Sequence, residues 1–277
     1  MSAKPPTISV VVPVYNDEPY VKACLGALQA QTVTPHEILF VDNNCTDGSM
    51  AIARRYKNVK ILHEPKQGLS YARNTGLNMA TGDILLRIDA DTVLPPTYIE
   101  RLQQLAVAHP DVAGFSGYGV SRYEFIPKIS LLWAWSYFAF TKAYLAYPVL
   151  WGANMAIRKQ YWHKAKKYLI NNDMAVHEDQ DVSLAIASVG GRVLVTRQLT
   201  VSVQMKAMFE YARYRKYGLM LQLLKRLDKE HPRYQLATRV PPLAWPKRAL
   251  YWVATVWAVY AFYLVTFAYE LMRKLRR

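Results

Sequence analysis

The stretch Gly82-Asp83-Ile84-Leu85-Leu86-Arg87-Ile88-Asp89-Ala90-Asp91 is an apolar run that ends in two carboxylates separated by one residue. Its pattern predicts a buried strand that delivers Asp89 and Asp91 to the edge of a sheet. Side chains two positions apart on a strand share a face, so both carboxylates can point at one ion. A hard divalent cation such as Mn²⁺ or Mg²⁺ takes one or two carboxylates and completes its shell from water and substrate phosphates. The stretch therefore predicts a site for a divalent cation and a diphosphate.

Three further apolar runs precede this stretch, at 8–15, 37–42 and 59–63, and each is followed by a helical pattern. Strands that alternate with helices at this spacing predict an α/β fold with a doubly wound, mostly parallel, Rossmann-like sheet flanked by helices. In such sheets ligands bind beyond the carboxyl ends of the strands. Four segments are therefore expected along one edge of the sheet: 13–16, 42–43, 68–74 and 89–91.

The second half of the chain continues with helices and strands. The expected elements are a helix over 95–108, a Gly-rich strand over 112–120, a strand over 151–158, a helix from His177 to Gly190 and a last strand over 192–196. The helix that begins near His177 opens with three acids, Glu178, Asp179 and Asp181. Acids in a first turn are commonly caps favoured by the helix dipole, which accounts for at least one of the three.

Composition limits the classes of partner. The formal net charge of +15 over 277 residues predicts an anionic partner, which is nucleic acid, an anionic membrane or a phosphorylated substrate. Nucleic acid is disfavoured because there is no base-reading basic helix, zinc-finger spacing or RNA-binding signature. The two isolated cysteines, Cys24 and Cys45, predict neither a disulfide framework nor a metal-binding pair. Residues 1–6 lack an apolar signal core, which predicts a cytoplasmic catalytic domain.

Basic, aromatic and apolar residues gather in the second half, a combination that indicates an anionic membrane surface. Residues 129–151 carry one charge, Lys142, and are interpreted as a segment in the lipid headgroup region, with a buried helix as the alternative. Residues 205–246 are predicted to be a basic, amphipathic helical linker. Residues 249–272 begin with 21 uncharged residues bracketed by basic ones, which predicts a membrane helix or, alternatively, an in-plane or re-entrant helix.

Four motifs, in this order, resemble the nucleotide-sugar half of family 2 glycosyltransferases of the GT-A fold. They are Val11-Val12-Pro13-Val14-Tyr15-Asn16, Val41-Asp42-Asn43-Asn44-Cys45-Thr46-Asp47-Gly48, Gly68-Leu69-Ser70-Tyr71-Ala72-Arg73-Asn74 and Asp89-Ala90-Asp91. The resemblance implies that Pro13, Tyr15 and Asp42 contact the nucleotide base, usually uracil. It implies that Asp89 serves the ribose or the metal and that Asp91 binds the metal. The remaining residues implied at the nucleotide-sugar site are Asn16, Gly68, Arg73 and Ala90.

Two positions in these motifs are open to more than one interpretation. Arg73 and its neighbour Asn74 either approach the diphosphate or cap and brace their helix. The family often has Asp where Asn43 stands, so the resemblance does not settle a base contact at Asn43.

Two later segments resemble the family's acceptor half. Trp151-Gly152-Ala153-Asn154-Met155-Ala156-Ile157-Arg158 resembles the strand that lines the sugar and acceptor pocket, which implies acceptor-side roles for Trp151, Gly152 and Asn154. The run Glu178-Asp179-Gln180-Asp181 resembles the acceptor-site acid motif. It implies that Asp179 is the general base and that Glu178 and Asp181 position the helix or the acceptor. His177 is either a further metal ligand or a structural residue.

The resemblance thus implies a metal-dependent, inverting glycosyltransferase, and the basic and apolar second half places it at the cell membrane. Its donor is a nucleotide sugar, with a UDP-sugar favoured, and its acceptor is a hydroxyl of a lipid-linked molecule or a glycan. The expected domain covers 1–204, with a nucleotide-sugar half at 7–94 and an acceptor half at 95–204. The alternatives are transfer to a polyprenyl phosphate, which needs no base, a catalytically inactive membrane-bound scaffold, and a nucleic-acid binder.

Overall fold

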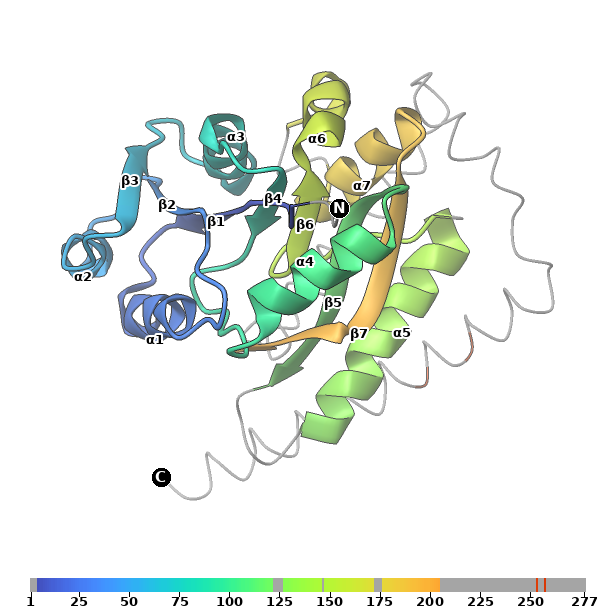
Figure 1. Cartoon of the computed structure of the whole chain (residues 1–277), viewed down its shortest axis with the longest axis horizontal. Coiled ribbons are helices and arrows are strands. Elements are labelled where there is room, and N and C mark those ends of the chain that lie inside the picture. Colours follow the sequence, from blue (N-terminus) through green and yellow to red (C-terminus); the bar gives the residue numbers. More distant parts are fainter. Residues whose placement is uncertain are drawn as a thin grey trace.

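The computed structural model describes residues 4–121, 127–145, 147–171 and 176–204, together with residues 253 and 257. The described chain forms a seven-stranded sheet in the order β3-β2-β1-β4-β6-β5-β7 (Figure 1). The strands are β1 (Ile8–Val14), β2 (Glu37–Asp42), β3 (Val59–His63), β4 (Ile84–Arg87), β5 (Val112–Ser121), β6 (Met155–Arg158) and β7 (Arg192–Val203).

Helices cover both faces of this sheet. They are α1 (Glu18–Gln29), α2 (Ser49–Ala53), α3 (Leu69–Met79), α4 (Tyr98–Ala108), α5 (Pro127–Leu145), α6 (Lys159–Ala165) and α7 (Glu178–Ser188), with a short 3₁₀ helix, η1 (Lys166–Tyr168). Val10 and Val12 of β1 belong to a core shared with α1, α2 and α4, whereas Val11 belongs to a second core with α3, α6 and α7. Since neighbouring side chains on a strand point to opposite faces, β1 must be apolar along nearly all of its length.

The predicted strands over 8–15, 37–42 and 59–63 are confirmed, and so is the sheet flanked by helices. Four pairs of strands are parallel: β1–β2, β1–β4, β2–β3 and β5–β7. In contrast, β6 runs antiparallel to both of its neighbours, β4 and β5, so the sheet is mixed. The apolar pattern of 151–158 does not report this reversal, because the alternation of side chains is the same in either strand direction.

The strand that carries the paired acids is shorter than predicted. β4 ends at Arg87, and the N–H of Thr92 donates to the carbonyl of Asp89 at 3.0 Å, which closes a turn. Asp89 and Asp91 therefore lie in a turn beyond the strand, and the expectation that strand geometry places both on one face was wrong. After this turn, Val93 forms an antiparallel bridge with Ser202 near the end of β7, a strand that continues past its predicted end at Thr196.

α5 covers β5 with one face and leaves apolar side chains on the other. The ring of Phe138 lies edge-on to that of Tyr118 in β5, with centroids 5.4 Å apart, whereas Leu131, Leu132 and Trp135 are exposed. Within the described ranges, we find no helix with the combined length and apolarity that crossing a bilayer requires. The predicted linker at 205–246 lies outside the described residues, as does the predicted membrane helix apart from residues 253 and 257.

Candidate active site

The carboxyl ends of β1 and β2 bring the residues predicted for base binding together. Val14 pairs with Asp42 across these strands, and the exposed Tyr15 follows directly. Asn16 has a left-handed backbone, with φ of 53°, and its Oδ1 accepts a hydrogen bond from the N–H of Thr46 at 2.8 Å. Asp42 Oδ1 accepts from the N–H of Cys45 at 2.9 Å. These bonds fix the two loops at this edge of the sheet, where Pro13 also lies, paired with Val41.

Asn43 holds the loop that leads into α3. Its side-chain nitrogen donates to the carbonyls of Glu64 and Lys66 at 2.9 and 2.8 Å, and its Oδ1 accepts from the N–H of Gly68 at 2.9 Å. Gly68 itself has a φ of 145°, which favours glycine. A carboxylate could not donate to two carbonyls, so an amide rather than an acid suits this buried position. In this chain Asn43 therefore holds the loop of residues 64–68 in place.

The acid turn follows β4. The Asp89 side chain is 41% exposed, and its Oδ1 lies 2.6 Å from Nη2 of the buried Arg87. Ala90 is buried and Asp91 is half-buried. Among the described residues no group of three or more His, Cys, Asp or Glu side chains gathers at metal-binding geometry. Two carboxylates in one turn are a donor set of the kind that a hard cation uses when water and phosphate complete its shell, and a cation at Asp89 and Asp91 stays a prediction.

Glu178, the first residue of α7, joins two buried arginines. Its Oε2 lies 2.6 Å from Arg73 Nη1, and its Oε1 lies 3.3 Å from Arg87 Nη1. Arg73 also donates from Nη1 to the Glu178 carbonyl at 2.9 Å and from Nε to Asn74 Oδ1 at 3.0 Å. Because Arg73 is fully buried in these contacts, the structure favours bracing over an approach to the diphosphate.

Asp179 is almost fully buried and has polar neighbours on both oxygens. Its Oδ2 accepts from the N–H of Gly152 at 3.3 Å and from the Tyr137 hydroxyl at 3.5 Å, and its Oδ1 pairs with Nδ1 of His177. Burial acts to raise the pKa of Asp179, but the charge of His177 and its hydrogen bond outweigh burial and lower it. Burial likewise acts to lower the pKa of His177, and the charge of Asp179 raises it instead. Each member of the pair thus favours the charged form of the other.

The third acid of α7 and the predicted glycine have structural contacts. Asp181 Oδ2 accepts from the N–H groups of Ile170 and Asn171 at 2.9 and 3.4 Å, which ties the preceding loop to α7. A Cβ on Gly152 would lie 2.2 Å from Arg87 Nη1 and 2.7 Å from Glu178 Oε1. Only a residue without a side chain leaves room here for the ion pair of Arg87 and Glu178, and the sequence did not predict this contact.

Asn154 has contacts within the core, and its predicted acceptor-side role stays a prediction. It is fully buried, its Oδ1 accepts from the Tyr98 hydroxyl, and its Nδ2 donates to the Leu199 carbonyl at 2.5 Å. Trp151 is half-buried, and its N–H donates to Ser116 Oγ at 3.0 Å. The pattern of residues 151–158 predicts a strand but does not report that Asn154 points into the core.

Two residues of the site were missed. Arg87 contacts both Asp89 and Glu178, and its signal was available: a charge inside an apolar strand is costly unless it is paired. Tyr137 reaches Asp179 from α5, and no feature of the sequence singles it out from the other tyrosines.

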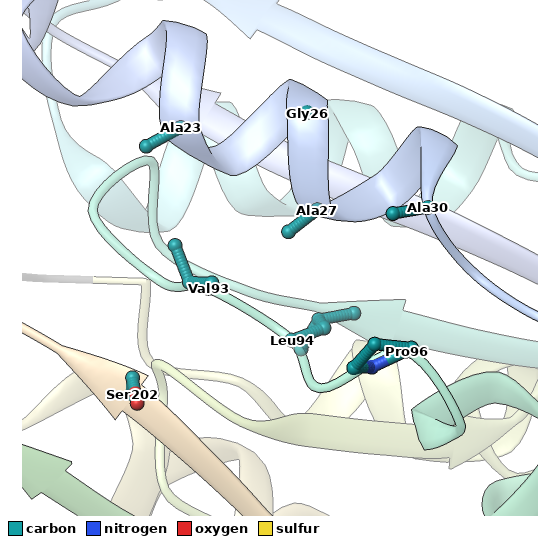
Figure 2. Close-up of a pocket in the computed structure, with 8 residues that line it drawn as sticks. All are labelled: Ala23, Gly26, Ala27, Ala30, Val93, Leu94, Pro96 and Ser202. Atoms are coloured by element: carbon teal, nitrogen blue, oxygen red, sulfur yellow. The ribbon is translucent and has the colours of Figure 1, made fainter.

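A separate hollow of about 560 Å³ lies between α1 and the segment 93–96 (Figure 2). Its lining is apolar apart from Ser202 and contains none of the predicted site residues. The lining residues are Ala23, Gly26, Ala27, Ala30, Val93, Leu94, Pro96 and Ser202.

Comparison with known families identifies the fold unit. The sequence model of glycosyl transferase family 2 matches residues 9–164, more than half of the chain. The chain belongs to glycosyl transferase family 2. The match covers all four nucleotide-sugar motifs and ends before α7.

Relatives of this family 2 chain match part of its length. It is 40% identical over 108 residues to glycosyltransferase AglE of Haloferax volcanii, and this match covers 36% of each of the two chains. It is 34% identical over 116 residues to an undecaprenyl-phosphate 4-deoxy-4-formamido-L-arabinose transferase of Aeromonas hydrophila, which covers 39% of this chain and 36% of that protein. The matched segments span about a third of the length of these curated relatives.

Solved structures share the sheet flanked by helices that the described residues form. A mannosyltransferase of Pyrobaculum calidifontis, PcManGT, solved with GDP-Man and Mn²⁺, has a TM-score of 0.59 at 20% identity and covers 98% of this chain and 89% of its own. TarS of S. aureus, residues 1–349 with UDP-GlcNAc, has a TM-score of 0.57 at 17% identity and covers 96% and 92%. Both show the predicted GT-A type of sheet flanked by helices.

Proposed function

We propose that this family 2 protein is a metal-dependent, inverting glycosyltransferase that uses a nucleoside-diphosphate sugar. The observation that carries the proposal is the placement of two sets of acids. Asp89 follows β4, in the turn that we assign to the donor, Asp179 lies in the first turn of α7, which we assign to the acceptor, and Arg87 with Glu178 links the two. The family match and the nucleotide sugars bound by PcManGT and TarS support this assignment.

The donor site is built on the first three motifs and the acid turn. Pro13, Tyr15 and Asp42 contact the base, for which uracil is favoured, beside Asn16, Gly68 and Ala90. Asp89 and Asp91 would hold a Mn²⁺ or Mg²⁺ ion, which when bound offsets the charge that develops on the departing diphosphate.

The acceptor chemistry rests on Asp179. His177 and the N–H of Gly152 keep this carboxylate ionised in a buried position, ready to take a proton from an acceptor hydroxyl. The acceptor oxygen attacks the anomeric carbon from the face opposite the leaving group. A new bond from carbon to oxygen forms as the bond to the diphosphate breaks, so one displacement inverts the configuration.

A screen of nucleotide sugars tests the proposal. The wild-type protein is expected to hydrolyse one of UDP-glucose, UDP-N-acetylglucosamine or GDP-mannose slowly in the presence of Mn²⁺. No hydrolysis and no thermal stabilisation by any of them would instead favour a catalytically inactive scaffold.

Two variants then separate the donor and acceptor roles. Asp179→Asn should lower transfer by about 10²–10⁴-fold and leave nucleotide affinity nearly unchanged. Asp91→Ala should weaken UDP binding in the presence of Mn²⁺, which calorimetry measures. Equal UDP affinity in Asp91→Ala and wild type would remove the metal assignment.

A second candidate is transfer to a polyprenyl phosphate. The similarity to an undecaprenyl-phosphate transferase favours it. A phosphate acceptor needs no general base, so transfer that persists in Asp179→Asn would select this reaction.

Membrane association is the last part of the proposal. The exposed Leu131, Leu132 and Trp135 of α5, the net charge of +15 and the apolar run within 249–272 all suit an anionic membrane surface, with the catalytic domain on the cytoplasmic side. We expect the protein to bind vesicles that contain anionic lipid, and we expect Trp135→Ser to bind them more weakly. Equal recovery of the protein with and without vesicles would contradict it.

A further inference from the structure

Arg87 contacts both halves of the site. It is the last residue of β4 and is 1% exposed. Its Nη2 lies 2.6 Å from Asp89 Oδ1, and its Nη1 lies 3.3 Å from Glu178 Oε1. Within the described ranges, Arg87 is the residue that forms ion pairs with both the acid turn and α7. A change at either acid therefore acts on the same guanidinium.

Glu178 is itself fixed on its other side. Its Oε2 lies 2.6 Å from Arg73 Nη1, so Asp89, Arg87, Glu178 and Arg73 form an alternating row of two acids and two bases. Their formal charges cancel, which suits a region where an unpaired charge costs several kcal/mol. The row begins at the proposed metal carboxylate and ends at α3, and it passes the residue next to Asp179.

The geometry around Arg87 requires a guanidinium. Its planar fork presents several N–H groups in fixed directions, whereas a lysine presents one compact ammonium. One ammonium cannot replace two nitrogen atoms of the fork that point at different acids. The backbone of Gly152 passes so close that a Cβ there would lie 2.2 Å from Arg87 Nη1, so the fork has little room to shift.

We infer that Arg87 is a positioning residue that couples donor binding to the first turn of α7, where Asp179 lies. The inference rests on the proposed function. Arg87 now lies closer to Asp89 than to Glu178, at 2.6 against 3.3 Å. When the donor and its cation share the Asp89 carboxylate, more of the attraction of Arg87 is left for Glu178. Donor binding thereby holds the start of α7, and with it the proposed base, more firmly.

Hydrogen exchange measures this coupling without a known acceptor. The probes are UDP with Mn²⁺ and GDP with Mn²⁺, added to the full chain. In the wild type, the nucleotide that binds should slow exchange in the peptide over 42–48 and also in the peptide over 176–188. A coupling of the usual size changes an equilibrium about 5-fold or more, so exchange at the start of α7 should slow by roughly that factor.

Arg87→Lys is the test variant, and Arg158→Lys is its matched control. Arg158 lies on the neighbouring strand β6 and donates to the carbonyls of Val112, Ala106 and His109, remote from the acids of the site. In Arg87→Lys the nucleotide should still slow exchange over 42–48, but the effect on α7 should fall to less than half. In Arg158→Lys both effects should stay as in the wild type.

The outcomes separate the inference from the proposed function. If neither nucleotide slows exchange over 42–48 in the wild type, the proposed function fails. If a nucleotide does so but α7 is unaffected, or if Arg87→Lys keeps the full effect on α7, the inference is overturned. If Arg87→Lys does not fold, Glu178→Gln replaces it, because it removes the charge at the other end of the same contact. Full protection of α7 in folded Glu178→Gln overturns the inference equally.

Discussion

Replacing Gly152 by Ala tests how closely the two halves of the site are packed. The added Cβ would lie 2.2 Å from Arg87 Nη1 and 2.7 Å from Glu178 Oε1. Since non-bonded heavy atoms are most stable about 3.5 Å apart, the guanidinium has to move by roughly 1 Å. That movement lengthens a contact with Glu178 that already measures 3.3 Å.

The expected loss of stability follows from two terms. Overpacking a filled site costs about 1–3 kcal/mol. A weakened buried ion pair adds to this, although Arg87 keeps Asp89 and Glu178 keeps Arg73, so the loss stays below the ~3–5 kcal/mol of a fully broken pair. We expect Gly152→Ala to lower the free energy of unfolding by about 2–4 kcal/mol, which is roughly 5–15 °C in Tm for a domain of this size.

Thermal and urea unfolding measure the effect, and Gly26→Ala is the control. A Cβ at Gly26, in the middle of α1, meets no atom within 4 Å. Gly26→Ala should therefore be neutral or stabilise the protein by about 0.4–1 kcal/mol. If Gly152→Ala unfolds within about 0.5 kcal/mol of the wild type, the packing argument for the site is refuted.

Three further predictions concern other contacts. Asn43→Asp should destabilise the protein by about 1–3 kcal/mol in urea unfolding, because a carboxylate would then face the carbonyls of Glu64 and Lys66. The control is Asn44→Asp, since the side-chain hydrogen bond of Asn44 to Pro65 is exposed to solvent. Partial burial acts to raise the pKa of Glu37, but hydrogen bonds from Thr81 and Ser9 lower it overall. Ionised Glu37 therefore stabilises the folded protein above about pH 4.3, and this contribution is lost as the pH falls through the lower pKa of the folded state. Glu37→Gln should then lose less stability than the wild type between about pH 6 and pH 3, and an equal loss would contradict this. His177→Gln removes the cation that lowers the pKa of Asp179, so the acidic limb of the rate profile should move to higher pH; an unmoved limb would show that His177 does not set that pKa.

The fold was largely predictable because its first half follows local rules. β1 is buried on both faces and must be apolar, and Pro19 in the first turn of α1 marks where that helix begins. The direction of β6 was not predictable, because the alternation of side chains along a strand is the same in a parallel and an antiparallel pair. The end of β4 at Arg87 depends on a turn closed by Thr92 and Asp89, a backbone contact that the apolar pattern does not encode.

The candidate site was predictable in its acids and less so in their partners. Asp89, Glu178 and Asp179 stand out by motif, but the role of Glu178 depends on two arginines that lie 105 and 91 positions earlier, one on α3 and one on β4. The contacts of Asn154 could not be predicted from its motif either. Its motif suggested the acceptor pocket, whereas its contacts with Tyr98 and Leu199 are set by packing between elements.

The contact between Arg73 and Glu178 also affects the order in which the protein folds. The two residues are 105 positions apart, and chains are made at about 5–20 residues per second, so both arginines leave the ribosome well before their acid does. A fragment that ends at residue 164, where the family match stops, would hold Arg73 and Arg87 in its interior without Glu178. Arg87 keeps its ion pair with Asp89 in that fragment, but Arg73 loses its ion-pair partner, and an unpaired buried charge costs several kcal/mol. We therefore expect residues 4–164 to complete their interior only after α7 has been synthesised.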